Sequence, residues 1–159
     1  MNNFIESEEF VKHLNNWLFK SEQKDSNWIF SNRSKIPNFF RKNSNYLYKG
    51  LFGVSELFNF KTGFVRLNGI LSFSEDENVA KKFLTDSSYK FRNGTGVKIL
   101  VKKRFSTIVF DINKYYLFYG DDRLFKMGFD EMNIDSMKKE KEIIVKDAKI
   151  YSKDFTILL

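Results

Sequence analysis

The pattern of apolar and polar residues predicts an amphipathic helix over residues 8–20. The apolar residues that recur there at helical spacing are Phe10, Leu14, Trp17 and Leu18. Such a stripe is typical of a helix that packs one face on a core. Ser7 stands just before it, where a hydroxyl oxygen can accept a backbone N–H and cap the helix. His13 lies off the stripe, so we expect it on the surface.

Further along the chain, short runs of aromatic and β-branched residues predict strands. These runs occupy residues 45–52, 69–73, 97–102, 107–110, 142–145 and 155–159. Ser74 and Glu77 have the spacing of a capping box ahead of an apolar run, which predicts a helix over residues 75–85. Gly120 indicates a turn. Residues 126–139 show no regular period and are expected to form a loop.

This arrangement favours an α+β fold, because the predicted strands are interspersed with few helices and do not alternate regularly with them. With 159 residues the chain fits a single domain. We expect residues 1–43 to form a helical cap and residues 44–159 to form a β-rich core.

The composition excludes several kinds of chemistry. The chain has no cysteine and one histidine, so disulfides, thiolate nucleophiles, cysteine-ligated metals and a histidine-rich zinc site are excluded. Any catalysis must use carboxylates, hydroxyls and cations, without a metal. No apolar run approaches the roughly 20 residues that cross a bilayer, and the N-terminus has no signal-peptide pattern. We therefore expect a cytoplasmic protein without a membrane partner.

The charge balance favours an anionic partner. Lys and Arg number 27 against 20 Asp and Glu, a net charge of +7. This charge suits nucleic acid, an acidic protein or a phosphate-bearing cofactor. The densest basic clusters, residues 102–104 and 138–141, are short, and ordinary solvated faces are the alternative interpretation.

Two carboxylates stand close together where the strand over residues 142–145 begins. In an extended backbone Glu140 and Glu142 would project from the same face, about 6–7 Å apart. Such a pair can carry out acid–base chemistry at one place. A solvated strand end is the alternative, and residues 75–77 hold a second acidic triplet of the same spacing.

Three short motifs occur in a particular order. They are Tyr48-Lys49-Gly50 in a predicted strand, Ser72-Phe73-Ser74 before a predicted helix, and Glu140-Lys141-Glu142 at the head of a later strand. Together they resemble the motifs of the arginine–serine–glutamate class of mono-ADP-ribosyltransferases, which includes cholera-toxin-like and clostridial toxins and bacteriophage enzymes that modify host proteins. The resemblance covers residues 45–150, and the small size and Lys-, Asn- and Phe-rich composition are most similar to the bacteriophage members. It implies a split core of two packed, mainly antiparallel β-sheets.

The resemblance implies a role for each glutamate and serine of the motifs. Glu142 would be the catalytic carboxylate that stabilises positive charge on the ribose of NAD as nicotinamide leaves. Glu140 would contact the acceptor and remove its proton, and a glutamate at this place implies an arginine acceptor. Ser72 would orient Glu142 and support the nicotinamide pocket. Ser74 would be the third motif residue, with a helix cap as its alternative role.

The resemblance also implies residues that hold NAD as a co-substrate. Lys49, flanked by Tyr48 and Gly50, stands where the family has arginine, and a lysine offers one compact charge instead of a planar fork. Arg66 is an alternative cation. The candidates to stack on nicotinamide are Tyr89 and Phe91.

The implied partner is an acceptor protein of a host cell, recognised in part by Phe129 in the loop before Glu140. Nucleic acid as the acceptor is a less favoured alternative. A second hypothesis, from a different class, keeps the fold without the activity. It describes a catalytically weak or inactive binding module whose basic surface holds an acidic protein or nucleic acid, and Lys49 in place of arginine favours it.

Overall fold

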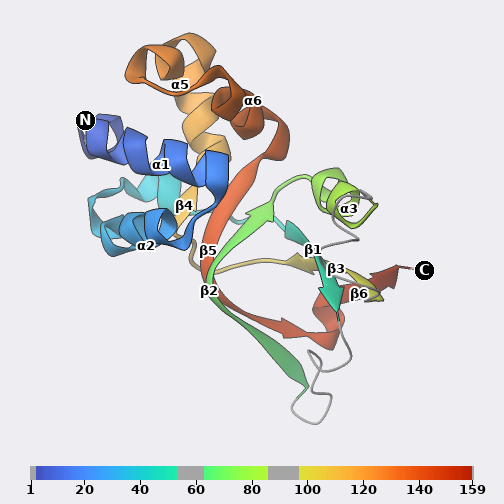
Figure 1. The fold of residues 1–159 in the computed structure, drawn as a ribbon. Coiled ribbons are helices and arrows are strands. Elements are labelled where there is room, and N and C mark those ends of the chain that lie inside the picture. Colours follow the sequence, from blue (N-terminus) through green and yellow to red (C-terminus); the bar gives the residue numbers. More distant parts are fainter. Residues whose placement is uncertain (1–2, 54–62, 86–96, 159) are drawn as a thin grey trace.

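The chain forms an open antiparallel β-sheet with helices packed on it (Figure 1). The computed structural model describes residues 3–53, 63–85 and 97–158. Within these ranges there are six strands and five α-helices, so the predicted α+β class is confirmed. The α-helices are α1 (Glu8–Lys20), α2 (Gln23–Ser31), α3 (Glu77–Thr85), α5 (Ile112–Met127) and α6 (Glu131–Glu140). The strands are β1 (Leu47–Gly53), β2 (Phe64–Ser74), β3 (Val97–Lys103), β4 (Phe110–Asp111), β5 (Glu142–Tyr151) and β6 (Phe155–Leu158). The short 3-10 helices are Asn3–Glu6, Arg33–Lys35, Asn38–Arg41 and Ser152–Asp154. None of the helices in the described ranges has the length and apolar character needed to cross a bilayer.

The sheet divides into two halves that are joined at one point. Its strand order is β4-β5-β2-β1-β3-β6. β1 pairs with β3 along its whole length, whereas in the described residues its pairing with β2 is the single pair Tyr48↔Ser74. The structure thus has one continuous sheet where two separate sheets were predicted. The division lies at this narrow joint between β1 and β2.

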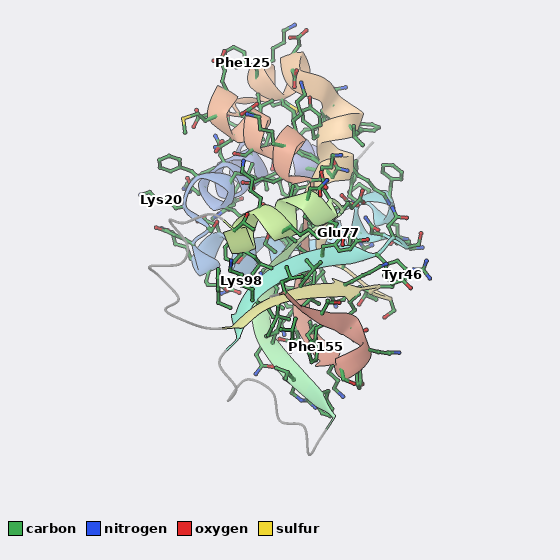
Figure 2. The ribbon with its side chains drawn as sticks, turned by 90° about the vertical axis from the view of Figure 1, so that its right-hand side faces the viewer. Lys20, Tyr46, Glu77, Lys98, Phe125 and Phe155 are labelled. Carbon is green, nitrogen blue, oxygen red and sulfur yellow. The ribbon has the colours of Figure 1, made fainter. Side chains whose placement is uncertain are left out.

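Among the described residues, buried apolar side chains form three clusters. The first packs α1, α2, α5 and α6 on the β4–β5–β2 half and includes Ile144 (Figure 1). The second contains residues from both halves, among them Leu47 of β1 and Ile143 of β5. The third lies under α3, where Leu84 meets Leu100 of β3 (Figure 2, viewed from the α3 side). Neighbouring residues of β5 therefore point to opposite faces of the sheet, as strand alternation requires.

Helix α1 has the bounds that its periodicity predicts, residues 8–20. The Ser7 hydroxyl oxygen accepts a hydrogen bond from the Phe10 N–H at 3.2 Å, which confirms the predicted cap. The helix ends at Ser21, whose backbone is left-handed (φ 53°) and whose N–H donates to the Trp17 carbonyl at 2.8 Å. Phe10 and Trp17 are buried, as the apolar stripe predicts.

His13 is not the surface residue that its position off the stripe predicts. Its Nδ1 lies 2.9 Å from Asp25 Oδ1, and its ring stacks on Trp28 with the centroids 4.1 Å apart. Asp25 is buried, and its second oxygen has no hydrogen-bond partner among the described residues. The packing of α2 along α1 creates this contact, which the spacing within one helix cannot reveal.

Two helices precede β5, and the turn predicted at Gly120 corresponds to a break within the first of them. α5 begins after Asp111, whose carboxylate accepts the Lys114 N–H at 2.9 Å, and it is interrupted at Gly120 (φ 79°). α6 covers residues 131–140, so the loop predicted over 126–139 is wrong. The buried residues of α6 are Asn133, Ile134 and Met137. Because only two of them are apolar, the helical period is weak in the sequence, and packing on α1 and α5 stabilises the helix.

Ser74 does not form the predicted capping box. α3 begins at Glu77, and the Asp76 carboxylate takes the capping position by accepting the Asn78 N–H at 2.9 Å. The Ser74 hydroxyl accepts the Asp76 N–H at 3.0 Å and donates to the Glu140 carbonyl at 2.6 Å. Ser74 therefore ties the end of β2 to the end of α6.

Replacing Gly50 with alanine is expected to lower the free energy of unfolding by about 1–3 kcal/mol. A Cβ at this position would lie 2.7 Å from the Ala80 carbonyl oxygen and 2.8 Å from Leu84 Cγ, because α3 packs directly on β1. Urea unfolding would measure the loss. Gly63→Ala is the matched control, since a Cβ there meets nothing within 4 Å and its cost comes from the left-handed backbone (φ 75°). A Gly50→Ala protein as stable as the wild type would contradict this close packing.

Candidate active site

Glu142 is the centre of the candidate site. It begins β5 and is 7% exposed. The Trp17 indole N–H donates to Glu142 Oε2 at 2.7 Å, and the nearby Ser72 hydroxyl favours the charged form of the carboxylate. The register of β2 on β5 places Ser72, Ser74 and Glu142 on one face of the sheet. Ser72 is therefore on the side of the sheet where the family resemblance expects it to orient Glu142.

The surroundings of Glu142 bring its pKa close to neutrality. Burial raises the pKa to about 7, and the nearby charge of Glu140 acts in the same direction. The Trp17 hydrogen bond, the nearby Ser72 hydroxyl and the charge of Lys49 act in the opposite direction. Near neutral pH the group therefore exchanges between a carboxylate, which can stabilise positive charge, and a neutral acid, which cannot.

Lys49 bridges the joint between the two half-sheets. Its Nζ donates to the Ser72 carbonyl at 3.0 Å and lies 5.8 Å from the centroid of the Phe73 ring. Burial lowers the pKa of Lys49, and the charge of Glu142 opposes that change. Strand alternation places Lys49 and Phe73 on one face of the sheet and Glu142 on the other. The cation is thus close enough to influence Glu142 but has a backbone carbonyl as its direct partner.

Glu140 reaches the site by a different route from the one predicted. It is the last residue of α6, and Lys141 after it is left-handed (φ 46°, ψ 50°), so the extended backbone expected from Glu140 to Glu142 is wrong. The two carboxylates are still close enough for their charges to interact. Glu140 is exposed, although partial loss of hydration raises its pKa. The end of a helix, and not a strand, therefore delivers the second carboxylate.

The residues on either side of Lys49 face α3. Gly50 is buried beneath that helix, so its contacts are with α3 and its implied contact with NAD has no support in the geometry. Tyr48 packs on the same cluster and lines a cleft of about 510 Å³. The other residues that line this cleft are Glu75, Asp76, Glu77, Asn113, Leu117 and Lys141. Three adjacent carboxylates make the cleft less suited to a phosphate than to a cation.

Four further candidates lie away from Glu142 or outside the described residues. Phe129 is 2% exposed and packs edge-on against Tyr115 with the ring centroids 6.0 Å apart, so its expected contact with an acceptor is corrected to a role in the core. Arg66 lies at the opposite end of β2 from Ser74, and its guanidinium is 5.6 Å from the Phe64 ring centroid. Tyr89 and Phe91 fall outside the described residues.

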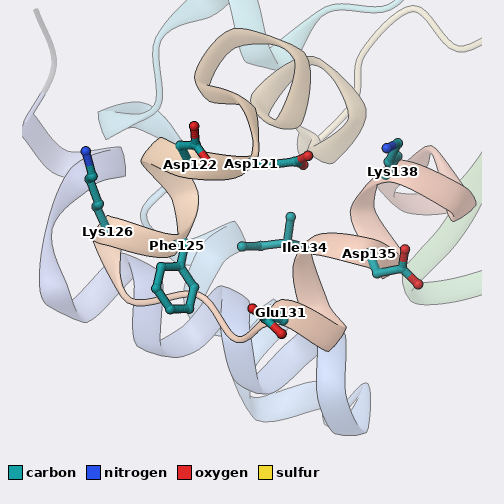
Figure 3. Close-up of a pocket in the computed structure, with 8 residues that line it drawn as sticks. All are labelled: Asp121, Asp122, Phe125, Lys126, Glu131, Ile134, Asp135 and Lys138. Carbon is teal, nitrogen blue, oxygen red and sulfur yellow. The ribbon is translucent and has the colours of Figure 1, made fainter.

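A second cleft, of about 570 Å³, lies between α5 and α6 (Figure 3). The residues that line it are Asp121, Asp122, Phe125, Lys126, Glu131, Ile134, Asp135 and Lys138. Figure 3 shows acidic and basic side chains mixed around its rim. Lys49, Ser72 and Glu142 are not among these residues, so this cleft is separate from the candidate active site.

Sequence reasoning missed Trp17 as a site residue. Its place in the apolar stripe of α1 indicated a core residue, and it is buried, but its indole N–H points at a carboxylate 125 positions later in the chain. No local signal pairs the two residues. In the ranges that the structure describes, no set of three or more His, Asp or Glu side chains is arranged to hold a metal ion.

Comparison of the chain with protein-family models, with curated proteins and with solved structures found no match. The function proposed for the chain therefore depends on the geometry around Glu142 and on the motifs that predicted it.

Proposed function

We propose that the protein is an NAD-dependent mono-ADP-ribosyltransferase that moves ADP-ribose onto an arginine side chain of a protein acceptor. One arrangement carries the proposal: the buried Glu142 carboxylate lies on the same face of the sheet as Ser72, beside the β1–β2 joint that Lys49 bridges. These residues lie far apart in the sequence, and the family resemblance assigns them the roles of catalytic glutamate, serine and cation. A buried carboxylate costs free energy, so packing alone gives little reason to place one here. The division of the sheet at the β1–β2 joint is consistent with the split core of that family.

Glu142 and the residues around it would each have a role in breaking the bond between ribose and nicotinamide. Glu142 would stabilise the positive charge that develops on the ribose as nicotinamide leaves with the bonding electrons. This stabilisation is stronger in a site shielded from water. Ser72 would keep the carboxylate oriented, and Lys49, from the other face of the sheet, would attract the phosphates of NAD through its charge. Only the ionised form of Glu142 can act in this way.

Glu140 would act as the base for the acceptor. As a guanidinium nitrogen of the acceptor forms the new bond to the ribose carbon, Glu140 would take up its proton. Loss of hydration raises the pKa of Glu140, which makes it a stronger base. Its exposed position at the end of α6 is open to a protein partner. We place this reaction in the cytoplasm of a host cell, on a host protein.

The proposal is tested with NAD labelled in its adenylate part. The purified protein is expected to transfer label to a protein in a host-cell extract and to release nicotinamide in equal amount. Lys49→Arg is expected to bind NAD about tenfold more tightly, because a guanidinium fork can hold a phosphate through two hydrogen bonds. Lys81→Arg, on the exposed face of α3, is the control that keeps the wild-type affinity. If neither the wild type nor Lys49→Arg binds NAD in a calorimetric titration, the proposed function is wrong.

One observation favours the second hypothesis, a binding module without catalytic activity. The Lys49 ammonium already donates to the Ser72 carbonyl and helps to join the two half-sheets, which gives it a structural role that needs no NAD. The basic surface would then hold nucleic acid or an acidic protein. Affinity for single-stranded nucleic acid that falls steeply with salt, together with no binding of NAD, would support this alternative.

A further inference from the structure

Helix α1 reaches the candidate active site through one side chain. Trp17 is 4% exposed, and its Nε1 lies 2.7 Å from Glu142 Oε2. An indole N–H is only a donor, so the direction of this hydrogen bond is fixed. We propose that Trp17 is a positioning residue that holds Glu142 in an oriented, ionised form, which makes the N-terminal helix part of the active site.

Hydrogen bonds fix α1 relative to the segment that leads into Glu142. The Asn15 amide donates to the Gly128 carbonyl at 3.1 Å and the Asn133 amide donates to the Asn15 carbonyl at 3.1 Å. The Asp130 N–H donates to Asn15 Oδ1 at 3.4 Å. These bonds tie α1, one turn or less from Trp17, to the start of α6. These bonds restrain the position of the Trp17 indole relative to α6, the helix that leads into Glu142.

Trp17 is also the strongest of the groups that favour the charged form of Glu142. The titratable groups whose charges act on this carboxylate are Glu140 from α6 and Lys49, which lies on the other face of the sheet, and their effects on its pKa oppose each other. The Ser72 hydroxyl from β2 lowers the pKa less than the Trp17 hydrogen bond does. Without the indole N–H, less would offset the rise in the Glu142 pKa that burial causes. A larger share of Glu142 would then be the neutral acid at pH 7.

Trp17→Phe keeps an aromatic ring in the core but removes the N–H donor, and it is expected to raise the pKa of Glu142 by about one pH unit. The ¹³C chemical shift of the Glu142 carboxyl carbon, assigned with Glu142→Gln, measures this directly. The acid limb of the pH profile of kcat/KM should move by the same amount. Trp28→Phe is the matched control, because Trp28 stacks on His13 and Phe4 and should leave both values unchanged.

A second measurement uses the wild-type protein and does not need Trp17→Phe to fold. The ¹H and ¹⁵N resonances of the Trp17 indole N–H should change with pH at the midpoint of the Glu142 titration. In Glu142→Gln the hydrogen bond has no titrating acceptor, so this change should disappear.

The outcomes separate this inference from the proposed function on which it rests. An unchanged Glu142 pKa in a folded Trp17→Phe protein overturns the inference, and if that variant does not fold, a Trp17 resonance independent of pH overturns it. A raised Glu142 pKa in a protein that never turns over NAD supports the effect of Trp17 and refutes the transferase activity instead. A merely structural Trp17 would lower the melting temperature on substitution and leave the Glu142 pKa where it is.

Discussion

A Glu142→Gln protein is expected to transfer ADP-ribose about 10³-fold more slowly than the wild type while keeping its fold. Glutamine has nearly the same shape, and its amide oxygen can still accept the hydrogen bond from the Trp17 indole. What the variant loses is negative charge, the property that the proposed mechanism uses to stabilise the ribose as nicotinamide leaves. The loss should therefore appear in kcat more than in the affinity for NAD.

Initial rates of nicotinamide release and of label transfer to protein, at saturating NAD, would measure this effect. Glu140→Gln is the matched control, because Glu140 is two residues away and proposed to act on the acceptor. Glu140→Gln should no longer transfer ADP-ribose to protein, but it should still release nicotinamide from NAD with water as the acceptor. A Glu142→Gln protein with the wild-type rate would contradict the mechanism. Loss of both reactions in Glu140→Gln would show that Glu140 does not act on the acceptor alone.

Glu142 is also expected to make the wild-type protein about 3 kcal/mol less stable above pH 7 than it is below pH 4.5. Burial raises the pKa of this carboxyl from 4.5 to about 7. Between these values the native protein keeps a proton that the unfolded chain has already released. The free energy of unfolding therefore falls as the pH rises through this window.

Urea unfolding of the wild type and of Glu142→Gln from pH 4.5 to pH 8 would measure the contribution. The comparison between the two proteins is needed because other groups titrate as well. Burial raises the pKa of Asp111, whereas the Gly69 N–H lowers that of Asp147. These effects are common to both proteins, so the difference between the two curves isolates Glu142. Parallel curves would contradict a buried, destabilising carboxylate at this position.

Local patterns predicted the elements whose sequence alone carries a strong signal. Helix α1 and its Ser7 cap are where the apolar stripe and the hydroxyl residue placed them. Strands β3 and β5 include the runs predicted over 97–102 and 142–145, β1 overlaps the run predicted over 45–52, and β5 begins at Glu142 as predicted. In these cases the physical cause acts within one element, through its apolar period or its cap, so the sequence is sufficient.

Predictions failed where neighbouring elements decide the backbone. α6 has few apolar residues, and its contacts with α1 and α5 supply the stabilisation that its own sequence does not show. The left-handed Lys141 then turns the chain between Glu140 and Glu142, which alternation along a strand could not anticipate. Phe129 and Gly50 carried functional expectations, but α5 and α3 cover them.

The sequence by itself determined the available chemistry: carboxylates, serines and cations without cysteine, on an α+β scaffold, with Lys49, Ser72 and Glu142 as the residues to examine. Only the tertiary structure decided that Ser72 and the Trp17 indole hold Glu142, and that Lys49 bonds to a backbone carbonyl. The physical reason is that burial and long-range hydrogen bonds depend on how packed elements meet. A local pattern places a carboxylate in a strand, but the side chains around that carboxylate determine its charge.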